Sequence, residues 1–296
     1  MRKAAEPPQA DPGMIPQMPG WIRLGSAQTL ADTAFLSGAA LSHLTLATAH
    51  PALPQSLWRD RQALAAAEVC VGCSGRREDQ AALRDAVHLI RPGDHPGPAG
   101  VILRQWSRAV ARPISVAHLV KALEGVSAEQ VTLCLEARGG TPVDRAAAVL
   151  EAILTEAPRA ETAALILADV VLSKAMGRDH VLPCLSLALK PRDLRLRDDD
   201  LRRTCHRAVV VGAGQAVALA ADLTQAAARL RRVAPKLRAK GAGQAVDLFL
   251  ARDALAPTAL SAIMSDRAAR RLCDRLVGLG AVRELTGRDS FRLYGV

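Results

Sequence analysis

The chain has 296 residues, enough for one large or two ordinary domains, and half of them are apolar, which is ample for a core. Only 2% are aromatic and alanine is abundant, which favours helices over sheets. The net charge of +10 and the pI of about 10.0 favour polyanionic partners, and we find no stretch of about 20 apolar residues that predicts a membrane span.

The first twenty residues are rich in proline and lack the charged-then-apolar order of a signal peptide. We therefore expect residues 1–20 to form a disordered arm and the protein to be cytoplasmic. Six cysteines then indicate reduced thiols rather than a disulfide framework.

Residues 21–252 predict an α-helical domain. We expect helices near 26–49, 54–71, 77–90, 99–111, 158–176 and 198–233, the first capped by Ser26. Further helices should follow Ser115, Ser127 and the pair Thr141-Pro142, in which proline takes the first helical position. Helices of this length with short connections predict a multi-helix bundle or array, so the fold class is mostly α.

Residues 253–296 change this pattern. Residues 258–264 predict a short helix, and Ser265 caps a second one that ends at Gly280. In that second helix, apolar residues share one half and arginines the other. Alternating residues on either side of the turn at 286–289 then predict a β-hairpin, with Phe291, Leu293 or Tyr294 packing on the helix.

Helix, turn, helix and hairpin in this order predict a winged helix-turn-helix that binds double-stranded DNA. The second helix of such a unit enters the major groove, where arginine recognises guanine or contacts phosphate. The predicted DNA contacts are Arg267, Arg270, Arg271 and Arg275 on the helix and Arg288 and Arg292 on the wing.

Residues 229–240 carry six cations and no acid. This run is either a solvated helix end, where cations are favourable, or an extension of the DNA footprint. The accessory contacts would be Arg231, Arg232, Lys236, Arg238 and Lys240.

Other motifs are incomplete. Residues 209–217 imitate a dinucleotide fingerprint but lack its third glycine and its acid, so no cofactor is expected. Cys70 and Cys73 form a CxxC without a second pair of ligands, so no metal is expected either. Asp94 and His95, in a loop rich in proline and glycine, remain an acid–base candidate. No Ser-His-Asp set stands out.

The pattern over residues 265–285 resembles the winged-helix domains of bacterial transcription regulators. Residues 280–288 are similar to the C-terminal tails of many Fic-family proteins. The Fic catalytic loop is missing here, since neither His50-Pro51 nor His95-Pro96 is followed by Gly-Asn-Gly-Arg. The whole chain resembles an uncharacterised alphaproteobacterial family common on rhizobial plasmids, through residues 84–98, 105–114, 234–242 and the tail. This family has no activity to carry over.

We therefore expect a DNA-binding regulator of transcription or of a plasmid function, whose helical domain dimerises or senses a partner. One alternative is an interaction module whose winged helix is a docking or dimerisation surface. A second alternative is an enzyme with its site near Asp94 and His95.

Overall fold

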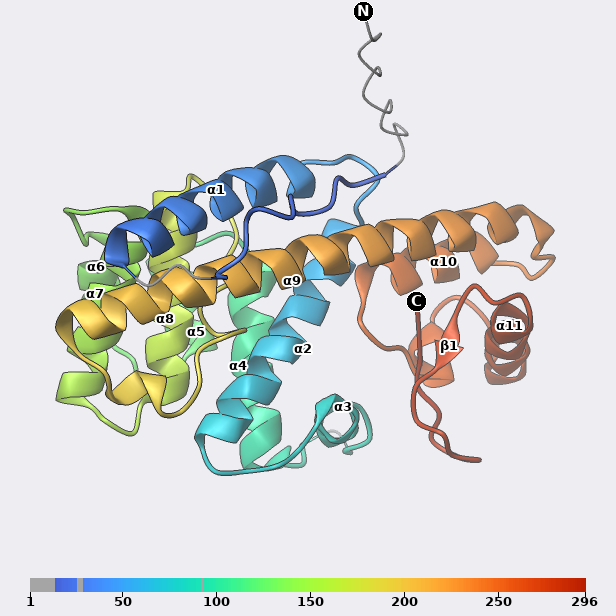
Figure 1. Ribbon diagram of the computed structural model, residues 1–296. Helices are drawn as coiled ribbons and strands as arrows, with labels where there is room; N and C mark the ends of the chain where they lie inside the picture. The colour runs from blue at the N-terminus through green and yellow to red at the C-terminus, as the bar shows by residue number, and fades with distance from the viewer. Residues whose placement is uncertain (1–13, 26–28, 92) are drawn as a thin grey trace, which may run out of the picture.

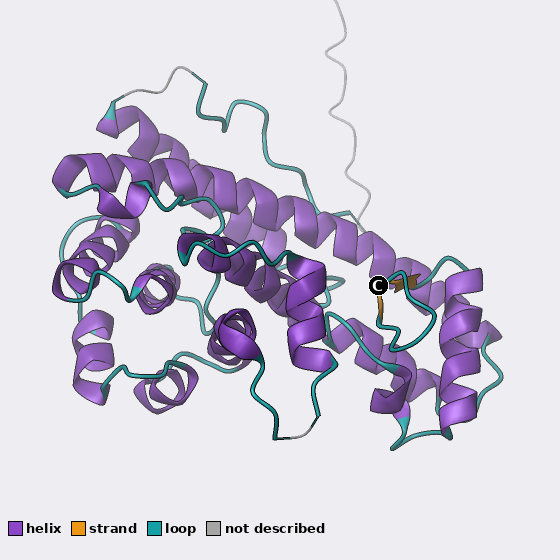
Figure 2. Cartoon of the chain, turned by 90° about the horizontal axis from the view of Figure 1, so that it is seen from below, coloured by secondary structure: helices purple, strands orange, loops and turns teal. Residues whose placement is uncertain are grey.

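The computed structural model describes residues 14–25, 29–91 and 93–296, and these residues form eleven α-helices and one two-stranded sheet. Figure 1 shows the helices gathered around one long central helix, with the chain's last elements at one end. From below, the short strands lie beside the C-terminus and helices make up most of the rest (Figure 2). The mostly α fold class predicted from composition is confirmed.

The central helix is α9 (Asp198–Val233), whose 36 residues run the length of the molecule (Figure 1). It packs most extensively on α1 (Leu30–Thr48) and also contacts α7 (Pro142–Glu156) and α2 (Gln55–Cys73). Of the helices described, α9 alone is long and apolar enough to cross a membrane, but 61% of its apolar window is buried inside the protein. Such burial is expected of a core helix.

The remaining helices of the body pack as neighbouring pairs. α8 (Glu161–Ala175) lies on α7, and α4 (Gly97–Ala111) lies on α2. Three shorter helices complete this part, namely α3 (Gln80–His88), α5 (Val116–Ala122) and α6 (Ala128–Leu135). Two indoles tie the layers together, since Trp58 Nε1 donates to Ala216 O at 3.1 Å and Trp106 Nε1 donates to Cys70 Sγ at 3.2 Å.

Side-chain caps set many of these helix starts. Ser115, Ser127 and Thr141 accept hydrogen bonds from first-turn N–H groups as predicted, and Pro142 occupies the first turn of α7. Thr29 caps α1, whereas the expected cap Ser26 lies outside the described residues. Most of the expected N-terminal arm also lies outside them. Its described part, residues 14–20, packs on the body, where Ile15 is 2% exposed.

A buried segment without regular structure, residues 181–189, precedes α9. Because its backbone is shielded from water, its N–H groups need acceptors inside the protein. Asp169 on α8 supplies them, accepting from the N–H groups of Cys184, Leu185 and Ser186 at 2.9–3.2 Å. Gly212 allows α9 to pack closely against this segment, since a Cβ at position 212 would lie 2.1 Å from Cys184 O. The dinucleotide-like run is therefore helical and packed.

The chain after α9 forms a smaller unit below the C-terminal half of that helix (Figure 1). Its elements are η2 (Ala234–Lys236), α10 (Ala242–Ala251), η3 (Pro257–Leu260), α11 (Asp266–Gly278), β1 (Arg283–Glu284) and β2 (Tyr294–Gly295). β1 and β2 pair antiparallel, and Leu255 forms a further antiparallel bridge to Tyr294. We call residues 234–296 the C-terminal unit.

Two expectations for this part were wrong in extent. The expected helix at 258–264 is a single 3-10 turn followed by irregular turns. The strands of the hairpin are only two residues long. The carboxylate of Glu284 accepts from Thr286 N and Gly287 N in the turn that follows.

Candidate nucleic-acid interface

The helix α11 is amphipathic in the way its sequence predicts. Ser265 Oγ accepts from Ala268 N at 3.4 Å and begins the helix, and Gly280 follows its end at a φ of +65°. Ala269, Leu272, Cys273 and Leu276 are buried against the rest of the unit. Val277, expected on the buried half, is 38% exposed. The four arginines of α11, at positions 267, 270, 271 and 275, are all exposed.

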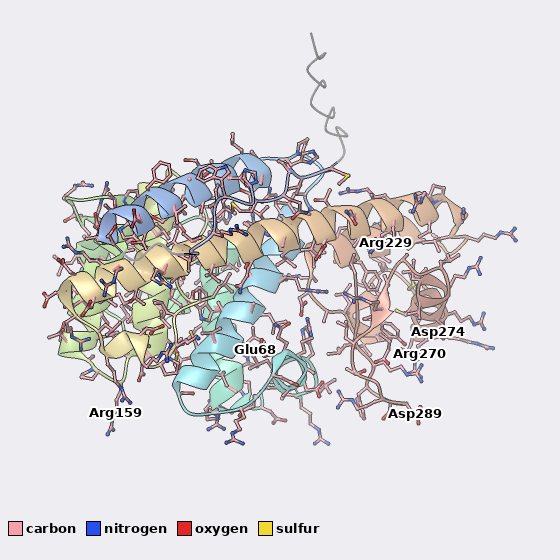
Figure 3. All side chains as sticks on the ribbon, in the orientation of Figure 1. Glu68, Arg159, Arg229, Arg270, Asp274 and Asp289 are labelled. Carbon is pink, nitrogen blue, oxygen red and sulfur yellow. The ribbon has the colours of Figure 1, made fainter. Side chains whose placement is uncertain are left out.

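These arginines are not equivalent. Arg270 forms an ion pair with Asp266 one turn earlier at 2.8 Å, and both side chains are more than half exposed. An exposed pair of this kind contributes well under about 1 kcal/mol, so the guanidinium exchanges readily to another partner. Figure 3 shows Arg270 and Asp274 on α11 at the far end of the molecule from Arg159.

Arg271 and Arg275 line a groove of about 810 Å³ between α11 and the segment that follows α9. The opposite wall is formed by residues 235–239, which include Lys236 and Arg238. Four of the nine lining residues are cationic and none is acidic. The structure thus brings the accessory run predicted at 229–240 and the helix α11 together at a single basic groove.

The other cations of the accessory run do not line this groove. Arg231, Arg232 and Lys240 are exposed. Arg229 lies on the C-terminal part of α9 (Figure 3). Because like charges gather here without an acidic neighbour in the run, this end of the molecule attracts anions.

The arginines of the hairpin have partners within the chain. Arg288 forms an ion pair of 2.5 Å with Asp85 of α3. Arg292 donates to Arg288 O at 2.8 Å and lies 3.7 Å from Asp289. Leu293 and Tyr294 are buried, whereas Phe291 is 75% exposed at a φ of +55°. Of the three expected packing residues of the hairpin, Phe291 therefore points away from the core.

A buried ionic cluster fixes the C-terminal unit to the body. Asp253, just after α10, forms ion pairs with Arg61 of α2 and Arg84 of α3, the second with two hydrogen bonds of 2.6 and 2.9 Å. Arg61 also donates to Val296 O at 3.0 Å. The side chains of Arg61 and Arg84 are only 13% and 10% exposed. We call Asp253, Arg61 and Arg84 the clamp. The sequence does not predict the clamp, because Asp253 is about 170 to 190 residues away from the two arginines.

Asp94 and His95 lie elsewhere. Both are exposed in the loop before α4, and His95 Nδ1 accepts from Gly97 N at 3.1 Å. Neither residue lines the basic groove. Cys70 is buried, and burial raises the pKa of its thiol far above the usual range. Within the described residues, no cluster of three or more histidine, cysteine or acidic side chains is placed to hold a metal ion.

Comparison with known proteins gives one match. A family model described as "Protein of unknown function (DUF1403)" matches residues 8–296. No curated protein and no solved structure matches the chain. Since the family model covers nearly the whole sequence, the chain belongs to the DUF1403 family.

Proposed function

We propose that this protein binds double-stranded DNA through its C-terminal unit, a winged helix-turn-helix in which α11 is the recognition helix. The observation that carries the proposal is the basic groove between α11 and residues 235–239, lined by four cations and no acid. Phosphate contacts from lysine and arginine supply most of the affinity of proteins for DNA.

The order of elements supports the same proposal. α10 is followed by the bridging residue Leu255, the η3 turn, α11 and the pair β1–β2. Helix, strand, turn, helix and hairpin is the order expected of a winged helix, and Leu255 supplies the third extended segment beside the hairpin. A regulator of transcription or of a plasmid function is the role that such a unit would serve.

The arginines divide into two groups under this proposal. Arg271 and Arg275, facing Lys236 and Arg238 across the groove, hold a phosphate backbone. Arg267 and Arg270 lie nearer the N-terminus of α11, the end from which a recognition helix contacts base edges. Arg288 is paired with Asp85, so it must exchange that carboxylate for a phosphate before the wing contributes.

The test is fluorescence anisotropy with a labelled random duplex of about 25 base pairs over a salt series. The double variant Arg271→Ala/Arg275→Ala removes two groove cations. The slope of log K against log salt should become shallower by about 0.9 for each phosphate that the variant no longer neutralises. Lys236→Ala/Arg238→Ala, on the opposite wall, should have a similar effect.

The matched control is Arg138→Ala/Arg159→Ala, which removes the same charge from exposed positions on the body. Its salt slope should stay close to that of the unchanged protein. If the groove variants and the control lose affinity equally, binding reflects net charge alone and the groove assignment fails. If the unchanged protein does not bind the duplex at low salt, the whole proposal fails.

A protein-docking role is the second candidate, and Phe291 favours it. An aromatic ring that is 75% exposed at the tip of a hairpin is an anchor of the kind found at protein interfaces. This candidate predicts a complex that survives nuclease treatment and is abolished in Phe291→Ala. DNA affinity unchanged in Phe291→Ala, with no nuclease-resistant complex in cell extract, would leave only the DNA-binding proposal.

A further inference from the structure

Three polar side chains from three helices meet in the body, at a distance from the C-terminal unit. Ser37 Oγ of α1 lies 2.7 Å from His206 Nδ1 of α9. His206 Nε2 lies 3.3 Å from Asp144 Oδ1 at the first turn of α7. We call these residues the triad. They are widely separated in the sequence and share no local motif, so the folded chain alone brings them together.

The ionisation of Asp144 and His206 sets the hydrogen-bond directions that the triad can adopt. Burial raises the pKa of Asp144, but hydrogen bonds from Thr141 and His206 outweigh this effect and hold the pKa below its usual value. Burial lowers the pKa of His206, so its ring is neutral near pH 7. An ionised Asp144 accepts only, which places the ring proton on Nε2 and leaves the lone pair of Nδ1 facing Ser37. The Ser37 hydroxyl donates to Ala34 O at 2.9 Å, so its proton must turn from that carbonyl to Nδ1 before Oγ can attack.

The triad is reached through a pocket of about 380 Å³ beside α1. Ser37 and His206 line it, together with a largely apolar wall that includes Ala34, Leu41, Pro142, Val143 and Met176. Ser37 is 1% exposed and His206 2%, so both lie at the floor of the pocket with little access to bulk water. No lining residue other than His206 is ionisable in the physiological range.

We propose that the triad is an acyl-transfer site, in which Ser37 attacks a small uncharged carboxylic ester with an aliphatic acyl group. The apolar wall would take the acyl chain, and the absence of charge from the lining disfavours ionic substrates. Serine, histidine and aspartate in this relation are recognised by geometry and roles rather than by position in the sequence.

In the reaction, Ser37 Oγ forms a bond to the acyl carbon while Nδ1 of His206 takes the hydroxyl proton. That proton passes to the leaving alkoxide as its bond to carbon breaks, so an alcohol departs and an acyl-serine remains. Water then attacks the acyl carbon, giving its proton to Nδ1, which returns it to Ser37 as the carboxylic acid leaves. Val143, in the first turn of α7, lines the pocket, and its N–H is one of the donors that a helix leaves without an intrahelical acceptor.

A polar bridge that only joins helices would have the same distances but would not react, and this difference is the basis of the test. The full chain is incubated with an alkyl fluorophosphonate, digested and analysed by mass spectrometry, and hydrolysis of p-nitrophenyl butyrate is followed in parallel. We expect the adduct on Ser37 and ester hydrolysis that the probe abolishes. A folded protein, as judged by circular dichroism, without an adduct on Ser37 overturns the proposal.

Two variants test the mechanism without removing the nucleophile. Asp144→Asn, at a side chain 24% exposed, should slow labelling at least about tenfold because the histidine loses its orienting acceptor. Gly38→Leu should block the pocket, since Gly38 lines it and a Cβ there meets no atom within 4 Å. The control is Ser261→Ala, an exposed serine of the C-terminal unit. Labelling of Ser37 at the unchanged rate in both Asp144→Asn and Gly38→Leu would show that neither the triad nor its pocket acts.

Discussion

The clamp at Asp253 is the most informative position to perturb, because one carboxylate pairs with two buried guanidinium groups. Asp253→Ala would leave Arg61 and Arg84, with side chains 13% and 10% exposed, without their acidic partner. Removing one partner of a buried ion pair costs about 3–5 kcal/mol, since an uncompensated charge stays buried. With a urea m value of about 3 kcal/mol/M, the unfolding midpoint of the clamp-dependent transition should fall by about 1 M or more.

Hydrogen exchange followed by mass spectrometry shows where that destabilisation falls. In Asp253→Ala, amides of the C-terminal unit should lose protection, while those of α7 and α8, which do not touch the clamp, should keep it. The control is Asp289→Ala, since Asp289 lies on the exposed hairpin turn and should change stability by less than about 0.5 kcal/mol. A destabilisation of under about 1 kcal/mol in Asp253→Ala would refute the reasoning that these guanidinium groups depend on Asp253.

Three further changes follow from the packing of the body. Burial raises the pKa of Asp60 to about 6, above its unfolded value, so Asp60 contributes a gain in stability as the pH falls from about 7 to 4.5. Asp60→Asn should remove this contribution, while that of Asp169, whose pKa burial also raises to about 6, should remain. The variant should stabilise the protein at pH 7.5 by at most about 3 kcal/mol, as urea titrations at pH 7.5 and 4.5 would show. Asp169→Ala should destabilise by more than about 3 kcal/mol in thermal or urea unfolding, because three buried N–H groups lose their acceptor. Gly212→Ala should cost about 1–3 kcal/mol through a clash with backbone. Gly214→Ala on the same helix is the control, because a Cβ there meets open space, and it should be neutral or stabilising. Equal destabilisation in the two glycine variants would contradict the close packing of α9 on Cys184.

Most helices of the body could be predicted from the sequence because their ends carry local signals. Ser115, Ser127 and Thr141 cap helices that begin at the next residue, and α9 has the bounds expected from its pattern. α10 was missed as a separate helix because Gly241, in the left-handed conformation, begins it without a side-chain cap. The start of a helix is therefore predictable from the sequence where an N-cap side chain accepts a hydrogen bond from the first turn.

The candidate sites depend much more on tertiary contacts. The arginine face of α11 follows from helical spacing, but its basic groove requires residues 235–239 to lie opposite that helix. No spacing rule predicts this arrangement. The same holds for the ion pair of Arg288 with Asp85 and for the triad, since residues 37, 144 and 206 come from separate helices. The helical period predicts on which face of a helix a residue lies, but it does not predict which distant residue the side chain contacts.

Because α9 is one continuous helix, it connects the triad to the segment that forms a wall of the basic groove. His206 lies near its start and Arg231 near its end, and 25 residues of helix at 1.5 Å each separate them by roughly 38 Å. Over that length, a tilt of about 5° displaces the far end by about 3 Å, which is comparable to a hydrogen bond. A ligand that wedges α1 away from α9 at the triad pocket and tilts α9 would therefore shift residues 235–239, which follow α9 directly, by a distance that a phosphate contact can sense.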